Sequence, residues 1–183
     1  MGTDRETATP HKNELFTGSN KDFIIRRCTT DDLEGVIKVN EKELPEDYPY
    51  FFYKSILDNY PEGFLLACHR KNPDKVVGYI MWRIERTPSK KSLKLINKGH
   101  LVSIAVNKKY RRKGIAKELL AQSMPAIKKY EIKEYVLEVR VSNYSAINLY
   151  KKFNYETQGI KKKYYKDGEN AYFMSVKTKD LAL

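Results

Sequence analysis

The strongest constraint on the fold is a strand, a basic turn, a helix and a second strand that follow one another along the chain. The segment 101–106 reads Leu-Val-Ser-Ile-Ala-Val and predicts a buried strand. After the basic turn 111–114, apolar residues recur at helical spacing from Ile115 to Ile127, and the apolar segment 135–141 predicts another strand. Parallel strands need a crossover connection of this kind. The two strands are therefore expected to lie parallel in one sheet, within an α/β fold.

The start of that helix has the properties of an anion site. The first N–H groups of a helix have no intrahelical partner, and the helix dipole adds about half a positive charge there. Gly114 lets the backbone come close to a ligand, and three basic residues precede it, Arg111, Arg112 and Lys113. The turn lacks the first glycine and the closing hydroxyl of a Walker A loop. The expected ligand is a diphosphate, and a basic helix start on a solvated surface is the alternative.

Further strands and turns are predicted on both sides of this unit. Apolar segments bounded by turn residues predict five more strands, at 23–28, 64–70, 76–86, 160–165 and 171–176. A turn is expected at 72–74, and the pair Asp167-Gly168 predicts a hairpin between the last two strands. A polar, lysine-rich loop is expected before Gly99.

Three more helices complete the prediction. They are expected from Thr30 to about Leu44, from the aromatic stretch after Tyr48 to about Asn59, and from Ala146 to Lys152. Pro45 ends the first of them, because proline disfavours helical geometry at the preceding residue. Asn143 is expected to cap the last helix, and Pro125 is expected to kink the long helix that follows the basic turn.

The length of 183 residues suits one domain, which is expected over residues 22–178. Residues 1–21 are polar and predict a disordered N-terminal arm and not a signal peptide, and residues 179–183 are expected to be a C-terminal tail. Cys28 and Cys68 lack metal-ligand spacing and fit a reducing compartment. No segment reaches membrane-spanning length. We therefore expect a cytoplasmic protein with no membrane partner and no metal site.

The formal net charge of +12 is compatible with nucleic-acid binding. The lysine clusters are short and lie among acidic residues, and no nucleic-acid-binding signature accompanies them. A basic, solvated surface is the preferred interpretation, so no specific nucleic-acid partner is expected. Docking near a ribosome would use the same surface.

Two further motifs, together with the basic turn, resemble one enzyme superfamily. Arg111, Gly114 and Ala116 match the pattern Arg/Gln-x-x-Gly-x-Gly/Ala, which holds the pyrophosphate of coenzyme A in the GCN5-related N-acetyltransferase (GNAT) superfamily. The segment 143–150 has the form Asn-x-x-Ala-x-x-Leu-Tyr, which is found in protein N-terminal acetyltransferases of that superfamily. The order of predicted elements also matches. The resemblance implies a GNAT fold, with a mixed sheet of about six to seven strands, about four flanking helices and a splayed parallel strand pair.

Two segments resemble a narrower group. The hairpin 163–172 and the segment 44–49 are similar to those of the catalytic subunit of the major eukaryotic N-terminal acetyltransferase and its archaeal relatives. The resemblance implies that both segments flank a peptide groove. The residues implied to hold or shape the substrate are Leu44, Pro45, Tyr48, Tyr164 and Tyr165.

The resemblance also implies a site for acetyl-CoA. Its residues would be Ile104, Ala105, Val106, Arg111, Arg112, Lys113, Gly114, Ile115, Ala116, Lys117, Asn143 and Tyr150. A backbone N–H near Val106 would polarise the thioester carbonyl. The Tyr150 phenol would donate a proton to the thiolate leaving group, and a tyrosine packed in the core is the alternative for this residue.

The acceptor amine must lose a proton, because a free α-amino group has a pKa of about 7.7–8.0. Glu46 corresponds to the family's catalytic glutamate. His100 and Glu138 would face each other on adjacent strands if the registers agree, and strand alternation would put His100 on one face with the even-numbered residues up to Val106. Burial would raise the pKa of Glu46 or Glu138. The sequence leaves open which group is the main base.

The predicted function is transfer of an acetyl group from acetyl-CoA to the N-terminal α-amino group of proteins, by direct attack in a ternary complex. Broad acceptance of Ser, Ala, Thr and Met-Leu N-termini is expected, without an obligate auxiliary subunit. Acetylation of lysine or polyamines is the alternative within the same chemistry. A basic nucleic-acid-binding module and a non-catalytic acyl-CoA sensor are the alternatives from other classes.

Overall fold

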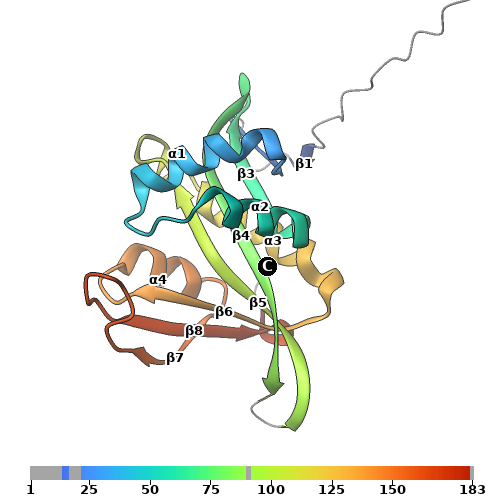
Figure 1. Ribbon diagram of the computed structural model, residues 1–183, viewed down its shortest axis with the longest axis vertical. Helices are drawn as coiled ribbons and strands as arrows, with labels where there is room; N and C mark the ends of the chain where they lie inside the picture. The colour runs from blue at the N-terminus through green and yellow to red at the C-terminus, as the bar shows by residue number, and fades with distance from the viewer. Residues whose placement is uncertain (1–13, 17–21, 90–91, 182–183) are drawn as a thin grey trace, which may run out of the picture.

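The structure is a computed structural model, and it describes residues 14–16, 22–89 and 92–181. One eight-stranded sheet, in the order β1-β2-β3-β4-β5-β6-β8-β7, runs through the molecule (Figure 1). Its strands are β1 (Glu14–Phe16), β2 (Phe23–Arg27), β3 (Phe64–His69), β4 (Asn72–Ser89), β5 (Ser92–Val106), β6 (Ile132–Arg140), β7 (Glu156–Lys161) and β8 (Ala171–Lys177). The α-helices of the described residues are α1 (Leu33–Glu43), α2 (Tyr50–Asn59), α3 (Ile115–Ala126) and α4 (Tyr144–Lys151).

The predicted parallel strand pair is present and splayed. β5 and β6 are the parallel neighbours of the sheet, and the other paired strands are antiparallel. The parallel pairing starts at Asn97 opposite Ile132 and ends at His100 opposite Val136. Beyond these residues the two strands separate, so the C-terminal half of β5 lacks a neighbour on that side. The mixed sheet and the four helices confirm the predicted fold class.

The two faces of the sheet carry different helices. Along β4, Tyr79 and Met81 belong to the core cluster that contains residues of α1 and α2, whereas Ile80 and Trp82 belong to the cluster that contains residues of α3 and α4. This alternation follows from the two-residue period of a strand. Both faces of the central strands are therefore buried, as in other sheets covered by helices on each side.

The expected disordered arm is wrong for three of its residues. Residues 14–16 form β1, which pairs antiparallel with β2 (Phe16 opposite Ile25) and adds an eighth strand to the sheet. An unpaired β2 edge would leave backbone donors and acceptors exposed, and β1 satisfies them. The rest of the predicted arm, 1–13 and 17–21, lies outside the described residues, as do residues 182–183 of the predicted tail.

The hairpin of β4 and β5 is much longer than expected. The sequence predicts a polar loop before Gly99, but Thr87 pairs with Ile96 and Pro88 with Leu95, so the strands continue into this segment. In Figure 1 both strands extend beyond their neighbours at one end of the sheet. Of the described lysines of this segment, Lys94 is exposed and Lys98 pairs with Glu134 at 2.9 Å, so a strand accommodates both.

One predicted turn and one predicted strand end also differ in position. Asn72 pairs with His69, so the turn between β3 and β4 lies at residues 70–71 and not at 72–74. β7 ends at Lys161, four residues before the end that the sequence predicts. The tyrosines that follow it therefore lie in the connection to β8 and not in a strand. Gly168 still forms the predicted turn, with a φ of 85° that favours glycine.

A β-bulge interrupts the alternation along β5. Leu101 lies opposite Trp82 and Ser103 opposite Met81, which leaves Val102 as the extra residue. The predicted common face of His100 with the even-numbered residues up to 106 is therefore wrong beyond Val102, because residues 104 and 106 pack in the same core cluster as Leu101.

The predicted helix after the basic turn is present, and Pro125 lies in its last turn. The chain then continues as a 3-10 helix, η4 (Ile127–Tyr130). Proline has no backbone N–H and disrupts the α-helical pattern around it, which agrees with the predicted distortion.

Candidate active site

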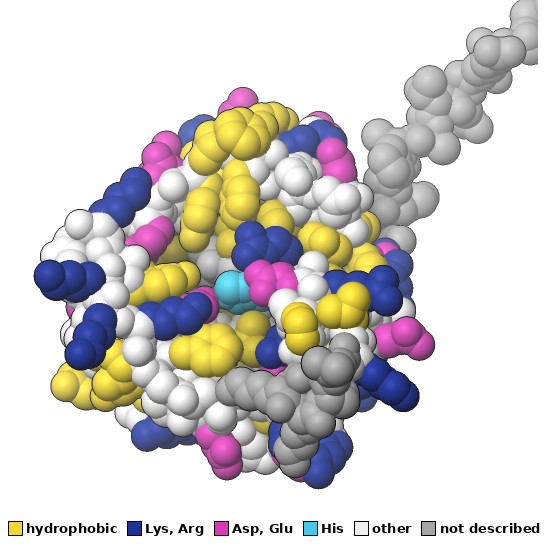
Figure 2. Space-filling view, turned by 60° about the horizontal axis from the view of Figure 1, so that its bottom comes forward, with side chains coloured by type: hydrophobic (Ala, Val, Ile, Leu, Met, Phe, Trp, Pro, Cys, Tyr) yellow, Lys and Arg dark blue, Asp and Glu magenta, His cyan; other side chains and the backbone are white. Residues whose placement is uncertain are grey.

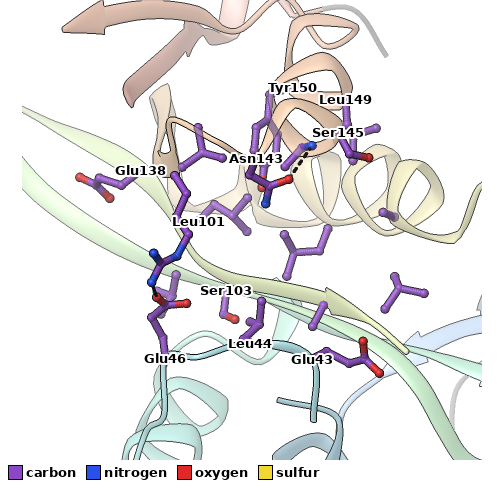
Figure 3. Close-up of a pocket in the computed structure, with 18 of the residues that line it drawn as sticks. Glu43, Leu44, Glu46, Leu101, Ser103, Glu138, Asn143, Ser145, Leu149 and Tyr150 are labelled. Atoms are coloured by element: carbon purple, nitrogen blue, oxygen red, sulfur yellow. Dashed lines mark hydrogen bonds and ion pairs between the residues drawn. The ribbon is translucent and has the colours of Figure 1, made fainter. Parts of the chain in front are cut away.

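A cavity of about 1290 Å³ opens where β5 and β6 separate. Its walls are the loop after α1, the C-terminal half of β5, the start of α3, the end of β6, α4 and the connection between β7 and β8. Figure 2 shows this kind of hollow on one face, where a histidine lies among acidic, basic and hydrophobic side chains. In Figure 3, Glu43, Leu44 and Glu46 lie on one side of the cavity and Asn143, Ser145 and Tyr150 on the other.

The start of α3 presents backbone N–H groups to one end of the cavity. The first helical hydrogen bond runs from the Glu118 N–H to the Gly114 oxygen (3.0 Å), so the amides of residues 115–117 have no intrahelical partner. Gly114 has a φ of 80° and Arg112 a φ of 65°, both in the left-handed region. Consecutive left-handed and helical residues of this kind form a concave set of N–H groups that suits an anion. Arg112, Gly114, Ile115, Ala116 and Lys117 line the cavity here.

The Arg111 side chain is held by hydrogen bonds to Glu43 and to the Val106 carbonyl. Its Nη2 lies 2.7 Å from Glu43 Oε2, and its Nε donates to the Val106 carbonyl at 3.0 Å. The other oxygen of Glu43 accepts the Lys108 N–H at 3.0 Å. Glu43 is nearly buried, with 4% of its side chain exposed. The end of α1 is thus tied to the basic turn by a residue that the sequence analysis missed.

Lys113 does not line the cavity. Its Nζ lies 5.6 Å from the Phe23 ring centroid and 6.0 Å from that of Tyr110, and of these two rings only Tyr110 lines the cavity. The inclusion of Lys113 in the predicted acetyl-CoA site is therefore not supported.

The α4 wall follows the prediction. The Asn143 side chain accepts the Ala146 N–H at 3.1 Å and caps the helix. Tyr150 lines the cavity and also belongs to the core cluster, with 5% of its surface exposed. Burial raises the pKa of Tyr150, so the phenol keeps its proton at neutral pH. Opposite α4, β5 lines the cavity with Ile104, Ala105 and Val106.

His100 bridges two carboxylates on neighbouring strands. Its Nε2 lies 2.6 Å from Glu138 Oε2 on β6, which is the contact that the sequence predicts. Its Nδ1 lies 2.7 Å from Glu85 Oε1 on β4, a partner that the sequence analysis missed. Arg83 donates to the same Glu85 oxygen, and Lys161 donates to the second oxygen of Glu138.

These contacts reverse the expected protonation of the pair. Burial would raise the pKa of Glu138, but hydrogen bonds and charge from His100 and Lys161 outweigh it and lower the pKa to about 2. The expected effect of burial is present, but the net shift of this pKa is opposite to it. Burial lowers the pKa of His100, but Glu138 and Glu85 outweigh it and the net pKa is raised. The imidazole thus favours its charged form between two carboxylates.

Arg140 joins two walls of the cavity. Its Nη2 lies 2.5 Å from Glu46 Oε1, and its Nη1 lies 2.7 Å from both Asp167 and Glu169 in the connection between β7 and β8. The guanidinium also lies 3.9 Å from the Tyr165 ring centroid. Among the described residues, these contacts hold one oxygen of Glu46 and leave the other without a hydrogen bond.

A buried polar network holds the backbone of the Glu46 loop. The Asn40 amide donates to the Glu46 carbonyl at 2.7 Å, and the Tyr79 hydroxyl lies 2.5 Å from Asn40 Oδ1 and 2.8 Å from Ser103 Oγ. Asn40 and Tyr79 are fully buried. Fully paired networks of this kind fix one arrangement of the chain.

The predicted peptide-groove residues lie at the same end of the cavity as Glu46. Leu44, Pro45 and Tyr48 line it from the loop after α1, and Tyr164 and Tyr165 line it from the connection after β7. Tyr48 stacks on Phe52 with ring centroids 4.8 Å apart.

The structure therefore brings together the predicted site residues, with Lys113 as the exception. It adds Glu43, Glu85 and Arg140, whose partners lie on other elements, so no local spacing marks them. Within the ranges described, no group of three or more histidine, cysteine, aspartate or glutamate residues is arranged to hold a metal ion. None of the helices in those ranges is long and apolar enough to cross a membrane.

Comparisons with known proteins agree with this geometry. An N-alpha-acetyltransferase of Saccharolobus solfataricus is 48% identical over 158 residues, which cover 85% of this chain and 93% of the relative. The N-terminal acetyltransferase A complex catalytic subunit ard1 of Schizosaccharomyces pombe is 38% identical over 154 residues, 82% of each chain. The crystal structure of Chaetomium thermophilum Naa20 in complex with a bisubstrate analogue has a TM-score of 0.72 at 28% identity, over 85% of this chain and 87% of that one.

The model of the acetyltransferase (GNAT) family matches residues 28–155, which is well over half of the chain. This segment contains every wall of the cavity except the connection between β7 and β8. The fold, the site and the relatives agree, and the chain belongs to the GNAT family of acetyltransferases.

Proposed function

We propose that this protein transfers the acetyl group of acetyl-CoA to the N-terminal α-amino group of proteins, in a ternary complex of enzyme, acetyl-CoA and peptide. The observation that carries the proposal is the division of one cavity into an amide-rich end at α3 and an aromatic, acidic end at Glu46 and Tyr164. The first end suits a diphosphate, and the second suits a peptide with a cationic N-terminus. The N-alpha-acetyltransferase of S. solfataricus supports the same activity for this chain.

The residues at the α3 end fit coenzyme A. Its pyrophosphate would accept hydrogen bonds from the amides of residues 115–117, with charge from Arg112 and Lys117, and we omit Lys113 from this role. Acetyl-CoA would supply the acetyl group as a thioester. The cavity continues from this end along β5 to Tyr150, which is the course that the pantetheine arm would take.

We propose that β5 and Tyr150 serve the reaction itself. Beyond His100, the side of β5 that faces β6 has no paired strand, so a backbone N–H near Val106 is available to polarise a carbonyl. Tyr150 would donate its phenolic proton to the departing sulfur, because burial keeps this side chain protonated at neutral pH.

We propose Glu46 as the group that takes the proton of the α-amine directly. Its free carboxylate oxygen lines the cavity, whereas both oxygens of Glu138 and both nitrogens of His100 already have partners. The His100–Glu138 pair would hold the second proton-accepting position, through a water between the pair and the amine. Loss of function at one position would then leave a residual rate from the other.

The substrate end would select extended protein N-termini. We propose that Tyr48, Tyr164 and Tyr165 hold the peptide backbone, and that Leu44 and Pro45 shape the pocket for the first residue. Broad acceptance of Ser, Ala, Thr and Met-Leu N-termini is part of the proposal. We also place the protein in the cytoplasm, near the ribosome and without an obligate auxiliary subunit.

The test is acetyl transfer from labelled acetyl-CoA to peptides that begin with Ser, Ala, Thr or Met-Leu. Each peptide is paired with a copy that has a blocked N-terminus and an internal lysine. Transfer only to free N-termini is the expected result. Transfer to the blocked copies would move the assignment to lysine acetylation, and cofactor binding without any transfer would refute an enzymatic role with these substrates.

A further inference from the structure

Glu85 contacts His100 from behind the cavity. Its Oε1 lies 2.7 Å from His100 Nδ1, yet Glu85 is absent from the cavity wall, whereas Arg83, His100 and Glu138 line it. The contact depends on the register of β4 and β5, in which Arg83 lies opposite His100 and Glu85 opposite Lys98. Glu85 therefore reaches the histidine diagonally, on the same face of the sheet.

The chemistry of a carboxylate determines which proton this contact requires. An ionised carboxylate only accepts hydrogen bonds, so His100 Nδ1 must carry a proton to bond with Glu85. The same reasoning applies to Nε2 and Glu138, so the two carboxylates compete for the single proton of a neutral ring. Without Glu85, a neutral His100 would keep its proton on Nε2 and could not accept another there.

The two competing contacts differ in their access to substrate. Glu138 lines the cavity, so an incoming ammonium can share its oxygens and weaken its bond to the ring. Glu85 lies behind the ring and keeps its bond when the cavity fills. Substrate entry would then favour the ring form with the proton on Nδ1, which leaves Nε2 free to accept one.

The other charged groups around His100 also affect where the ring carries its proton. On β4, Arg83 Nη2 lies 2.5 Å from Glu85 Oε1, and burial raises the pKa of Glu85 but hydrogen bonds from His100 and Arg83 outweigh it and lower the pKa. The same Nη2 lies 3.5 Å from His100 Nδ1 and would donate to an unprotonated Nδ1, but the contact of Nδ1 with Glu85 is much shorter, at 2.7 Å. Lys161 on β7 holds the second oxygen of Glu138, and Tyr164 lies close to the same carboxylate. On β5, Lys98 is paired with Glu134 of β6 at 2.9 Å, so it does not compete for Glu85.

We infer that Glu85 is a positioning residue that holds the His100 proton on Nδ1, so that proton exchange with the active site takes place at Nε2. The inference rests on the proposed acetyltransferase function for its catalytic consequence. The ring geometry itself does not depend on that function. The same division of labour between an orienting carboxylate and an exchanging nitrogen is found in other histidine-dependent enzymes.

The experiment compares Glu85→Gln with Glu85→Asp and with a matched control, Glu62→Gln. Like Glu85, Glu62 is a carboxylate that contacts two side chains, in this case Lys129 and Tyr130, and it does not line the cavity. The ¹⁵N chemical shifts of His100 are recorded against pH without substrate, with selective histidine labelling and assignment by His100→Gln. The pH profile of kcat/KM is measured for each variant.

In Glu85→Gln we expect the fraction of the neutral ring in the Nδ1–H form to fall in favour of the Nε2–H form, and the His100 titration midpoint to fall by about one pH unit. We expect kcat to fall about tenfold or more with KM changed less than about twofold, because binding contacts stay in place. Glu85→Asp restores the wild-type tautomer at least in part, and Glu62→Gln leaves both readouts unchanged.

Unchanged His100 tautomer and midpoint in Glu85→Gln would overturn the inference, and so would equal changes in Glu62→Gln. Failure of the wild-type protein to acetylate peptides would instead contradict the proposed function, because the nitrogen shifts are read without substrate. If Glu85→Gln fails to fold, Glu85→Asp provides the same comparison, since its shorter side chain lengthens the contact to Nδ1 and must move the midpoint downward by a smaller amount.

Discussion

Replacement of Asn40 by alanine tests the buried network behind the Glu46 loop. The change removes two hydrogen bonds, from the Asn40 amide to the Glu46 carbonyl (2.7 Å) and from the Tyr79 hydroxyl to Asn40 Oδ1 (2.5 Å). Each bond contributes about 1 kcal/mol net, and the Glu46 carbonyl loses its buried donor, which costs about 1–2 kcal/mol more. The Tyr79 hydroxyl keeps Ser103 as a partner. We therefore expect the free energy of unfolding to fall by about 3–4 kcal/mol.

The assay is urea unfolding at pH 7, followed by circular dichroism, with the slope of the transition checked for two-state behaviour. A loss of this size corresponds to a fall in melting temperature of roughly 6–16 °C for a domain of 150–250 residues. The loop that carries Glu46 also loses its anchor, so kcat falls more than the affinity for acetyl-CoA. This split distinguishes a displaced Glu46 from general unfolding.

A double-mutant cycle with Tyr79→Phe makes the reasoning refutable. The single Tyr79→Phe change leaves Asn40 Oδ1 and Ser103 Oγ without their buried partner and should cost about 1–3 kcal/mol. Once Asn40 is alanine, one of these two partners is gone, so the double variant should lose about 1 kcal/mol less than the sum of the single losses. Additive losses, or a loss below about 1 kcal/mol in Asn40→Ala, would show that the network does not hold the loop.

Three further predictions concern the other end of the cavity and the response to pH. Gly114→Val puts a branched side chain at a φ of 80°, so the turn must strain or change shape; we expect coenzyme A affinity, measured by calorimetry, to fall about tenfold. Lys113→Met should leave that affinity within about twofold, whereas Arg111→Met, which frees Glu43, should weaken it about tenfold; equal effects would contradict the assignment. The pKa of Glu138 is lowered to about 2 by its partners, from about 4.3 in an unfolded chain, so its stabilising contribution is complete above about pH 5 and is lost as pH falls through this range. The acid-unfolding curve of Glu138→Gln should therefore be flatter between about pH 5 and pH 2 than that of the wild type, and parallel curves would refute this.

Local patterns in the sequence were sufficient for most of the fold. The crossover unit, the cap at Asn143 and the turn at Gly168 depend on neighbouring residues, and all three are present. The long hairpin of β4 and β5 was missed because its lysines resemble a loop. Only pairing between the two strands makes this segment regular, and a single strand carries no sign of its partner.

In the candidate site, too, the residues of local motifs were predicted and those that depend on long-range contacts were missed. Residues that belong to contiguous motifs, such as those of the basic turn, were predicted together, although Lys113 of that turn packs against Phe23 and does not line the cavity. Glu85 and Arg140 were missed because their contacts depend on register and on loops that meet only in the folded chain. The shift in the pKa of Glu138 was predicted with the wrong sign for the same reason, because burial was visible in the sequence pattern and Lys161 was not.

The short pairing between β5 and β6 also affects how the molecule unfolds. Between residues 97 and 100 the two strands form one ladder, and beyond Val136 the sheet continues as two separate blades, β1–β5 and β6–β8. Local unfolding can separate β5 from β6 at this short pairing while the other strand pairs on each side remain intact. A ligand that spans the cavity contacts both parts of the sheet, so its binding stabilises their association. At about a hundred times its dissociation constant, such a ligand adds about 2.7 kcal/mol of stability.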